Sequence, residues 1–247
     1  MKSYAEISRQ IGTAVYINGK NAFDEYGADL IEEAPVSGAV KASYDDIPGY
    51  SALTVYKKDI DIRGRQYSFY IGGPDRDTAE INCSRLIHAA QDCVIKTADT
   101  EFEYSAALKD YSITTTGVDH YILLEMTFAV VKRLPLRSRR YTPDDLYGKT
   151  ELVVQNPGTA ESAVCITVET GTSADFEVAG VHMTNVTAQK KYKIDGLYEG
   201  RVTKNGANCF TDSDLVSFPK MEPGENRITF SGESISAITL EYYPTFI

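Results

Sequence analysis

The stretch FPKMEPGENRITFS, residues 218–231, joins a turn signal to a strand of strict alternation. Pro223 presets the backbone dihedral angle for the first central position of a tight turn, and Gly224 supplies the positive φ that a type II turn needs at the second. Beyond the turn, Ile228 and Phe230 point to one face of a strand, while the polar residues between them point to the other. Ile238, Leu240 and Tyr242 form a second alternating run after it, and we predict that residues 205–247 together form the closing edge of a small antiparallel sandwich.

Similar alternating runs recur from residue 150 to residue 247. They are separated by turns that contain Gly or Asn, at a spacing of about ten residues, which is typical of a β-sandwich. The clearest runs are Val164–Val168, Phe176–Val178, Tyr192–Ile194 and Ile238–Tyr242. The sequence therefore predicts a C-terminal antiparallel β-sandwich over residues 150–247.

Residues 1–133 predict a second, β-rich domain with one helix. A helix is expected at about residues 77–94, with Asp77 as its N-cap and Glu80 in the capping-box position. Apolar residues recur there at helical spacing: Ala79, Cys83, Leu86, Ile87, Ala90 and Val94. The fold class is therefore mostly β, with an α+β N-terminal domain that packs one helix on a sheet.

The strongest strand of this domain is residues 121–131. Its even positions are all apolar and are expected to face the core: Ile122, Leu124, Met126, Phe128 and Val130. Its odd positions are mixed, and include Leu123, Glu125, Thr127 and Ala129. A subunit interface would show such a mixed second face, and so would partial burial under a loop. Both interpretations stay open, and these four residues are the candidate interface.

Residues 134–149 are predicted to be a linker, because charged residues and turn formers dominate and neither period is present. A basic cluster stands out there in an otherwise acidic chain. Its residues Arg137, Arg139 and Arg140 are a candidate arm that docks onto an acidic neighbour. The alternative is a solvated linker with no partner.

Composition excludes several classes of function. The net charge of −10 over 247 residues argues against a nucleic-acid-binding surface, since phosphate contacts need clustered Lys and Arg. The longest apolar run is too short to cross a bilayer as a helix, and residues 1–10 do not form a signal peptide, so no membrane partner is expected. The four cysteines lack paired spacing and are expected to be free thiols in a reducing cytoplasm.

No motif predicts chemistry. The three histidines have no metal-site spacing, GxSxG and phosphate-loop motifs are absent, and 35 acidic residues produce carboxylate pairs by chance, such as Glu101 with Glu103 and Asp144 with Asp145. Asp212-Ser213-Asp214 lacks the glycine and glutamate of an EF-hand loop and is expected to cap a turn. We therefore predict that the chain is not an enzyme and that it has no catalytic residue, cofactor or metal.

The order of features in the second half resembles the distal tail proteins (Dit) of siphophages and prophages. The features that carry the resemblance are Asn156-Pro157-Gly158-Thr159, the strands Ala163–Glu169 and Phe176–Val178, Asn205-Gly206, Phe218-Pro219, and Pro223–Ile228. The resemblance implies an N-terminal domain that forms a hexameric ring and a galectin-like C-terminal sandwich. It also implies a virion protein, made in the bacterial host cytoplasm, that joins the tail tube to the tail-tip hub or fibre proteins.

A carbohydrate-binding β-sandwich involved in cell-surface recognition is the alternative function. Tyr242 shares the parity of the core residues Ile238 and Leu240, so Tyr243 is the freer candidate to stack on a sugar. The absence of Trp weighs against this alternative.

Overall fold

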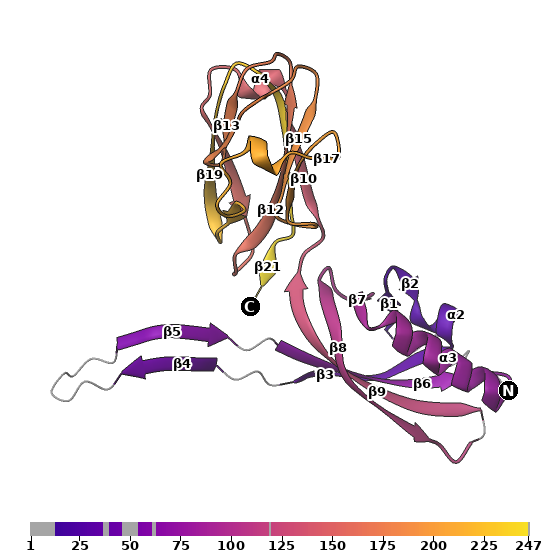
Figure 1. The fold of residues 1–247 in the computed structure, drawn as a ribbon. Helices are drawn as coiled ribbons and strands as arrows, with labels where there is room; N and C mark the ends of the chain where they lie inside the picture. Colours follow the sequence, from indigo (N-terminus) through magenta and orange to yellow (C-terminus); the bar gives the residue numbers. More distant parts are fainter. Residues whose placement is uncertain (1–12, 37–39, 46–53, 61–62, 119, 247) are drawn as a thin grey trace. The chain divides into compact units, whose positions relative to one another are not determined.

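The computed structural model describes residues 13–36, 40–45, 54–60, 63–118 and 120–246, without the side chains of residues 40–45, 54–60 and 63. The chain divides into two compact units, Met1–Lys132 and Arg133–Ile247. Both units are built mainly from antiparallel strands (Figure 1), which confirms the predicted mostly-β fold class.

The first unit contains one large sheet. Its strand order is β2 (Lys20–Asn21), β1 (Val15–Ile17), β7 (Asp92–Thr97), β8 (Glu103–Thr115), β9 (Tyr121–Arg133), β6 (Arg63–Gly72) and β3 (Ala28–Val36). Two further strands, β4 (Val40–Asp45) and β5 (Thr54–Ile60), pair with each other. Strand β8 is continuous over its thirteen residues.

Helices cover one face of this sheet and close its core. The longer helix is α3 (Arg76–Ala89), and the shorter is α2 (Ala22–Tyr26). The even residues of β9 are buried against α3, as predicted: Ile122, Leu124, Met126, Phe128 and Val130. The odd residues of β6 join them in the same core: Tyr67, Phe69 and Ile71. The alternation in the sequence therefore assigned the core face of β9 correctly.

The helix differs from its expected bounds at both ends. Its N-cap is Asp75, whose side chain accepts a hydrogen bond from the Thr78 N–H at 2.7 Å. It ends at Ala89, because residues 92–97 alternate between exposed and buried positions and form β7 between β1 and β8. Cys93 and Val94 therefore lie on a strand. Their spacing in the sequence fits a helix as well as a strand, and pairing with the neighbouring strands decides for the strand.

The second unit is a sandwich of two sheets around its own core. One sheet has the order β10 (Arg137–Tyr141), β20 (Ile235–Tyr242), β12 (Ser162–Thr170), β15 (Lys191–Asp195), β16 (Arg201–Lys204) and β17 (Ala207–Asn208), with β18 (Lys220–Met221) paired to β12. The other has the order β11 (Glu151–Asn156), β19 (Gly224–Ser231), β13 (Phe176–Val178) and β14 (Val181–Met183). A 3-10 turn, η1 (Phe210–Asp212), and a short strand, β21 (Thr245–Phe246), complete it.

Gly224, at the start of β19, has the predicted positive φ, +90°. Ile228 and Phe230 are buried while Arg227 and Thr229 are exposed, as the alternation predicted. However, β19 lies between β11 and β13, and β20 lies between β10 and β12, so both are inner strands and not the closing edge that the sequence suggested for residues 205–247.

Residues 137–146 belong to the sandwich, which differs from the linker expected at residues 134–149. Strand β10 pairs with β20 over five residue pairs, and α4 (Pro143–Leu146) follows it. Tyr141 and Leu146 anchor the segment, since both side chains are buried in the sandwich core. The other strand positions are three arginines and a serine, all exposed, so the sequence has no apolar alternation to indicate this edge strand.

Candidate interaction surfaces

The outer face of the first sheet, opposite the helices, carries the four candidate interface residues. Leu123, Glu125, Thr127 and Ala129 alternate with the buried residues of β9, and each is half-buried. Neighbouring strands cause this partial burial: Leu123 lies opposite Tyr70 of β6, and the Glu125 carboxylate accepts a hydrogen bond from the Ser112 hydroxyl at 3.0 Å. The face is therefore a fixed, mixed surface, and its role in subunit contact stays a prediction.

An apolar hollow adjoins this face at the turn end of β8 and β9. Tyr70, Thr116, Val118 and Tyr121 line a space of about 440 Å³. Nearby strand positions of β8 expose further large apolar side chains, Tyr111 at 49% and Ile113 at 51%. The sequence pattern alone does not reveal this hollow, because it does not show that the apolar side chains of β8 lack a covering element there.

The basic residues Arg137, Arg139 and Arg140 lie on β10, the edge strand of its sheet. Arg140 pairs with Glu169 at 2.6 Å, and the Arg139 guanidinium lies 4.8 Å from the centre of the Tyr141 ring. Charged side chains on an edge strand hinder unwanted pairing with another sheet. This role accounts for the cluster within the unit, and docking onto an acidic neighbour stays a prediction.

The candidate sugar-stacking residue Tyr243 is half-buried, and the Arg133 guanidinium lies 3.8 Å from its ring centre. Tyr198 is more exposed, at 50%, with the Lys193 ammonium 4.9 Å from its ring centre. One ring face of each tyrosine is thus already in contact with a cation. Tyr242 is buried, as predicted. Sugar stacking by Tyr243 stays a prediction.

The residues considered for chemistry are separated or already engaged. His88, His120 and His182 are all exposed, and within the described residues no group of three His, Cys, Asp or Glu side chains could hold a metal ion. The Asp214 carboxylate accepts a hydrogen bond from the His182 N–H at 2.7 Å, and Asp212 accepts one from the Asn185 amide at 3.0 Å. Both aspartates therefore tie the segment after β17 to β14.

The remaining carboxylate candidates do not form a site within either unit. Glu101 and Glu103 belong to the first unit. Asp145, in the second, accepts hydrogen bonds at 2.8 Å from the backbone N–H and the hydroxyl of Thr142, and these bonds lower its pKa. It is therefore a helix cap. All four cysteines are free and buried, and burial raises the pKa of Cys165 to about 11.

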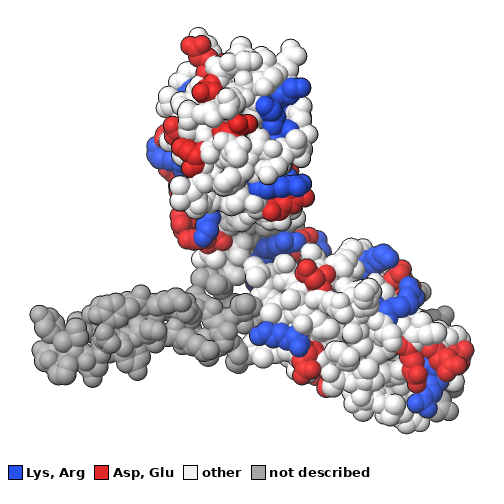
Figure 2. Space-filling model, viewed as in Figure 1, with Lys and Arg blue, Asp and Glu red and all other residues white. Residues whose placement is uncertain are grey.

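Charges of both signs are interspersed on the visible face of each unit, without a broad basic patch (Figure 2). Among the described residues, no helix has the length and apolar character needed to cross a membrane.

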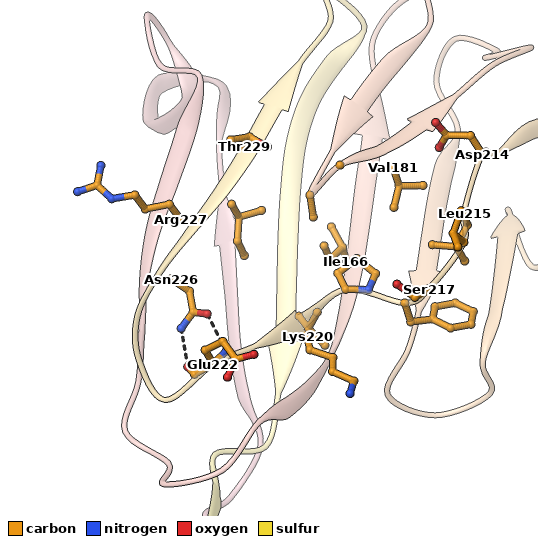
Figure 3. A pocket seen from close by; sticks show the side chains of 17 residues that line it. Ile166, Val181, Asp214, Leu215, Ser217, Lys220, Glu222, Asn226, Arg227 and Thr229 are labelled. Atoms are coloured by element: carbon orange, nitrogen blue, oxygen red, sulfur yellow. Dashed lines mark hydrogen bonds between the residues drawn. The ribbon is translucent and has the colours of Figure 1, made fainter. Parts of the chain in front are cut away.

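A groove opens in the second unit between β19 and the segment at residues 214–220, with a volume of about 890 Å³. The buried side chains Val164, Ile166 and Val181 line it from within the sandwich. Figure 3 shows Ile166 between the side of β19, marked by Asn226 to Thr229, and the opposite side, marked by Asp214 to Ser217. No pattern in the sequence indicated this groove.

Comparison with known proteins identifies the architecture. No family model matches the chain, and neither does any curated protein sequence. Among solved structures, the crystal structure of the SPP1 Dit protein matches with a TM-score of 0.70 and 12% identity, over 95% of this chain and 99% of that one. This chain has the fold of a phage Dit protein. The Dit resemblance inferred from the order of motifs is thereby confirmed at the level of the fold.

Two baseplate structures match the same Dit-like fold. A chain of the phage p2 baseplate, in its activated conformation with strontium, aligns with a TM-score of 0.60 and 10% identity over 94% of this chain and 97% of that one. A chain of the phage P2 baseplate with calcium aligns with a TM-score of 0.58 and 9% identity, over 94% and 98%. The likeness therefore extends through both units in each comparison.

Proposed function

We propose that this chain is a structural, non-enzymatic component of a phage tail tip. The observation that carries the proposal is the likeness to SPP1 Dit, which runs through both units in one chain and covers nearly all of each protein. That protein is described as a paradigm of the hub adsorption apparatus in phages that infect Gram-positive bacteria. The protein would be made in the host cytoplasm and act in the virion tail.

The first unit would assemble with copies of itself into a closed ring, a hexamer by the Dit resemblance. A ring requires head-to-tail contacts, in which one patch of a subunit meets a different patch of the next. The outer face of β9 and the adjoining hollow suit one side of such a contact. Leu123 and Ala129 supply apolar area there, while Glu125 and Thr127 supply polar groups, and an interface of this kind needs both.

The ring would join the tail tube to the hub or fibre proteins of the tail tip. Nucleic acid and membrane are not partners in this proposal. The exclusion of nucleic acid is supported by the net charge of −10 and by the interspersed surface charges (Figure 2), because a nucleic-acid-binding surface needs clustered Lys and Arg.

The mass of the full chain in solution tests the proposal. Light scattering at high protein concentration is expected to give six times the mass of the 27.3 kDa chain, and the substitution Thr127→Arg is expected to reduce it to that of single chains. The arginine would place an unpaired charge and a long side chain in a contact built for a small hydroxyl. Thr172→Arg, on an exposed turn of the second unit, is the matched control and should leave the mass unchanged.

Two results would contradict this proposal. One is a wild-type chain that remains a single copy at high concentration and adds to no purified tail tube. The other is a ring that tolerates Thr127→Arg, which would place the contact elsewhere on the first unit.

A further inference from the structure

Strand β13 leaves half of β19 without a neighbour on one side. β13 ends after Val178, because Ala179 and Gly180 have φ of +53° and +75° and turn the chain back into β14. β13 therefore pairs with β19 only at Ser231 and Phe230. In the described second unit, β19 from residue 224 to residue 228 has β11 on one side and no strand on the other.

The backbone of Arg227 points into the groove. The Phe230 N–H donates to the Thr150 carbonyl at 2.9 Å, so Phe230 faces the β11 side. In an antiparallel strand, the backbone N–H and C=O groups of successive residues point alternately to the two neighbouring strands. The backbone groups of Ile228 therefore also point to β11, while those of Thr229 and Arg227 point to the opposite side. The Thr229 carbonyl does accept a hydrogen bond on that side, from the Ala179 N–H at 2.8 Å. Two residues before Thr229, the N–H and C=O of Arg227 face this same side, where the described second unit has no strand and Arg227 lines the groove.

The groove has the form that an added strand requires. Neighbouring strands lie about 4.8 Å apart and rise about 3.3 Å per residue, so a five-residue strand spans about 17 Å. The space of about 890 Å³ runs beside β19, and alternate side chains of an added strand would point at Val164 and Ile166. At one end, Asn226 closes it through hydrogen bonds with the backbone N–H and C=O of Glu222, drawn as dashed lines in Figure 3.

We propose that this groove binds an extended peptide segment of a partner protein, which adds to β19 as a strand. An unpaired strand edge supplies main-chain hydrogen bonds to such a segment, and pockets for alternate side chains supply selectivity. The site lies wholly in the second unit and does not depend on ring formation by the first.

Charge complementarity limits the segment. The two cations that line the groove are already paired: Lys220 with Glu161 at 2.7 Å, and Arg227 with Glu151 at 2.7 Å and with Glu225 at 3.1 Å. Two carboxylates, Asp214 and Glu222, line the groove beside these paired cations. With the three partners of the cations, five carboxylates and two cations lie in or next to the groove. The partner segment carries apolar residues at every second position, with Lys, Arg or neutral polar residues between them and no acidic ones.

A random library of seven-residue peptides, selected on the full chain, tests the site. The expected result is enrichment of peptides with apolar residues at alternate positions and few Asp or Glu. Bound peptides should slow amide exchange at Arg227 while leaving the amide of Ile228, already paired with β11, unchanged. Enrichment of acidic or non-alternating peptides, protection at another surface, or no enrichment at all would overturn the proposal.

Arg227→Pro separates strand addition from ordinary surface binding. Proline removes the N–H that faces the groove and removes no hydrogen bond to β11, because Arg227 faces away from β11. We expect affinity for the selected peptides to fall about tenfold or more, the value of one lost backbone hydrogen bond. Arg227→Thr, which removes the charge but keeps the N–H, should change affinity less than about threefold. Equal losses in the two variants, at unchanged circular dichroism, would refute main-chain pairing.

Discussion

Asp195 gives the most direct test of how the second unit is held together. It ends β15 with only 1% of its surface exposed. One carboxylate oxygen accepts hydrogen bonds from the N–H groups of Leu197 at 3.1 Å and Tyr198 at 2.8 Å. The other pairs with the Lys193 ammonium at 3.0 Å. Both the turn that presents Tyr198 and the end of the strand thus depend on one buried charge.

Two substitutions divide its contribution. Asp195→Ala removes every acceptor, and a hydrogen bond to a charged group contributes about 1.5–3 kcal/mol. The Lys193 side chain is 37% exposed, so water solvates it when the pair is lost, and the pair adds at most about 1 kcal/mol. We expect a loss of about 3 kcal/mol in the free energy of unfolding for Asp195→Ala. Asp195→Asn keeps the acceptor for the turn and should cost about 1 kcal/mol.

The pH dependence of stability follows from the pKa of Asp195. Burial acts to raise that pKa, but the Tyr198 N–H, the Lys193 ammonium and the Leu197 N–H outweigh burial, and the net effect is a pKa below the usual value for aspartate. A folded-state pKa below the unfolded one, about 3.9, means that the stabilisation is present above pH 4. It is lost as pH falls through the folded-state pKa. The difference between wild type and Asp195→Asn should therefore be largest near neutral pH and shrink on acidification.

Pulse-labelling hydrogen exchange across a urea series measures the stability of the second unit around β15. A local measurement is needed because the two units can unfold separately. The urea midpoint of peptides from β15 is compared after equilibration at pH 7 and at pH 3. Asp175→Asn is the control, since Asp175 is an exposed carboxylate of the same unit. Equal losses for the alanine and asparagine variants, or a wild-type advantage at pH 3 as large as that at pH 7, would refute the assigned roles of Asp195.

Two further predictions concern buried thiols and a backbone conformation. Cys165 is fully buried, and burial raises its pKa to about 11. Iodoacetamide at pH 8 should therefore leave Cys165 unmodified in the native chain and alkylate it in urea. Rapid labelling of the native chain, measured by mass spectrometry, would contradict this prediction. Gly27→Ala should destabilise the first unit by about 1–3 kcal/mol more than Gly19→Ala. Both glycines have positive φ, but an added Cβ lies 2.5 Å from the Gly72 carbonyl oxygen only at Gly27; equal unfolding midpoints would contradict this reasoning.

The core faces were predictable because the period of two in β9 and β19 has a direct physical cause. Successive side chains of a strand point to opposite faces, so when Phe128 or Ile228 faces the core, the residues before and after it face outward. The end of α3 and the strand β10 were not predictable in the same way. Val94 fits a helical spacing as well as a strand, and only pairing with distant strands decides between them. In β10 the sole buried residue is Tyr141, too little apolar pattern to reveal a strand.

The candidate surfaces were harder to predict than the core. The outer face of β9 was found because its residues are interleaved with core residues on the same strand. The groove beside β19 was not found, because it results from the length of another strand. Ala179-Gly180 ends β13 after only three residues, Phe176–Val178, and the unpaired edge that this creates lies on β19, about fifty residues later in the chain. A pattern within one segment carries no information about a neighbour that stops short.

The low identity to SPP1 Dit, 12% at a TM-score of 0.70, has a consequence for function. Alternation and turns with positive φ can be satisfied by many residues, so they preserve the fold while outward side chains change freely. Contacts with other subunits and with partner proteins depend on those outward side chains, and cannot be transferred from the similar structure residue by residue. Thr127→Arg and Arg227→Pro probe the two units independently. A ring lost only in the first variant, with peptide binding lost only in the second, would assign assembly and partner recognition to different units.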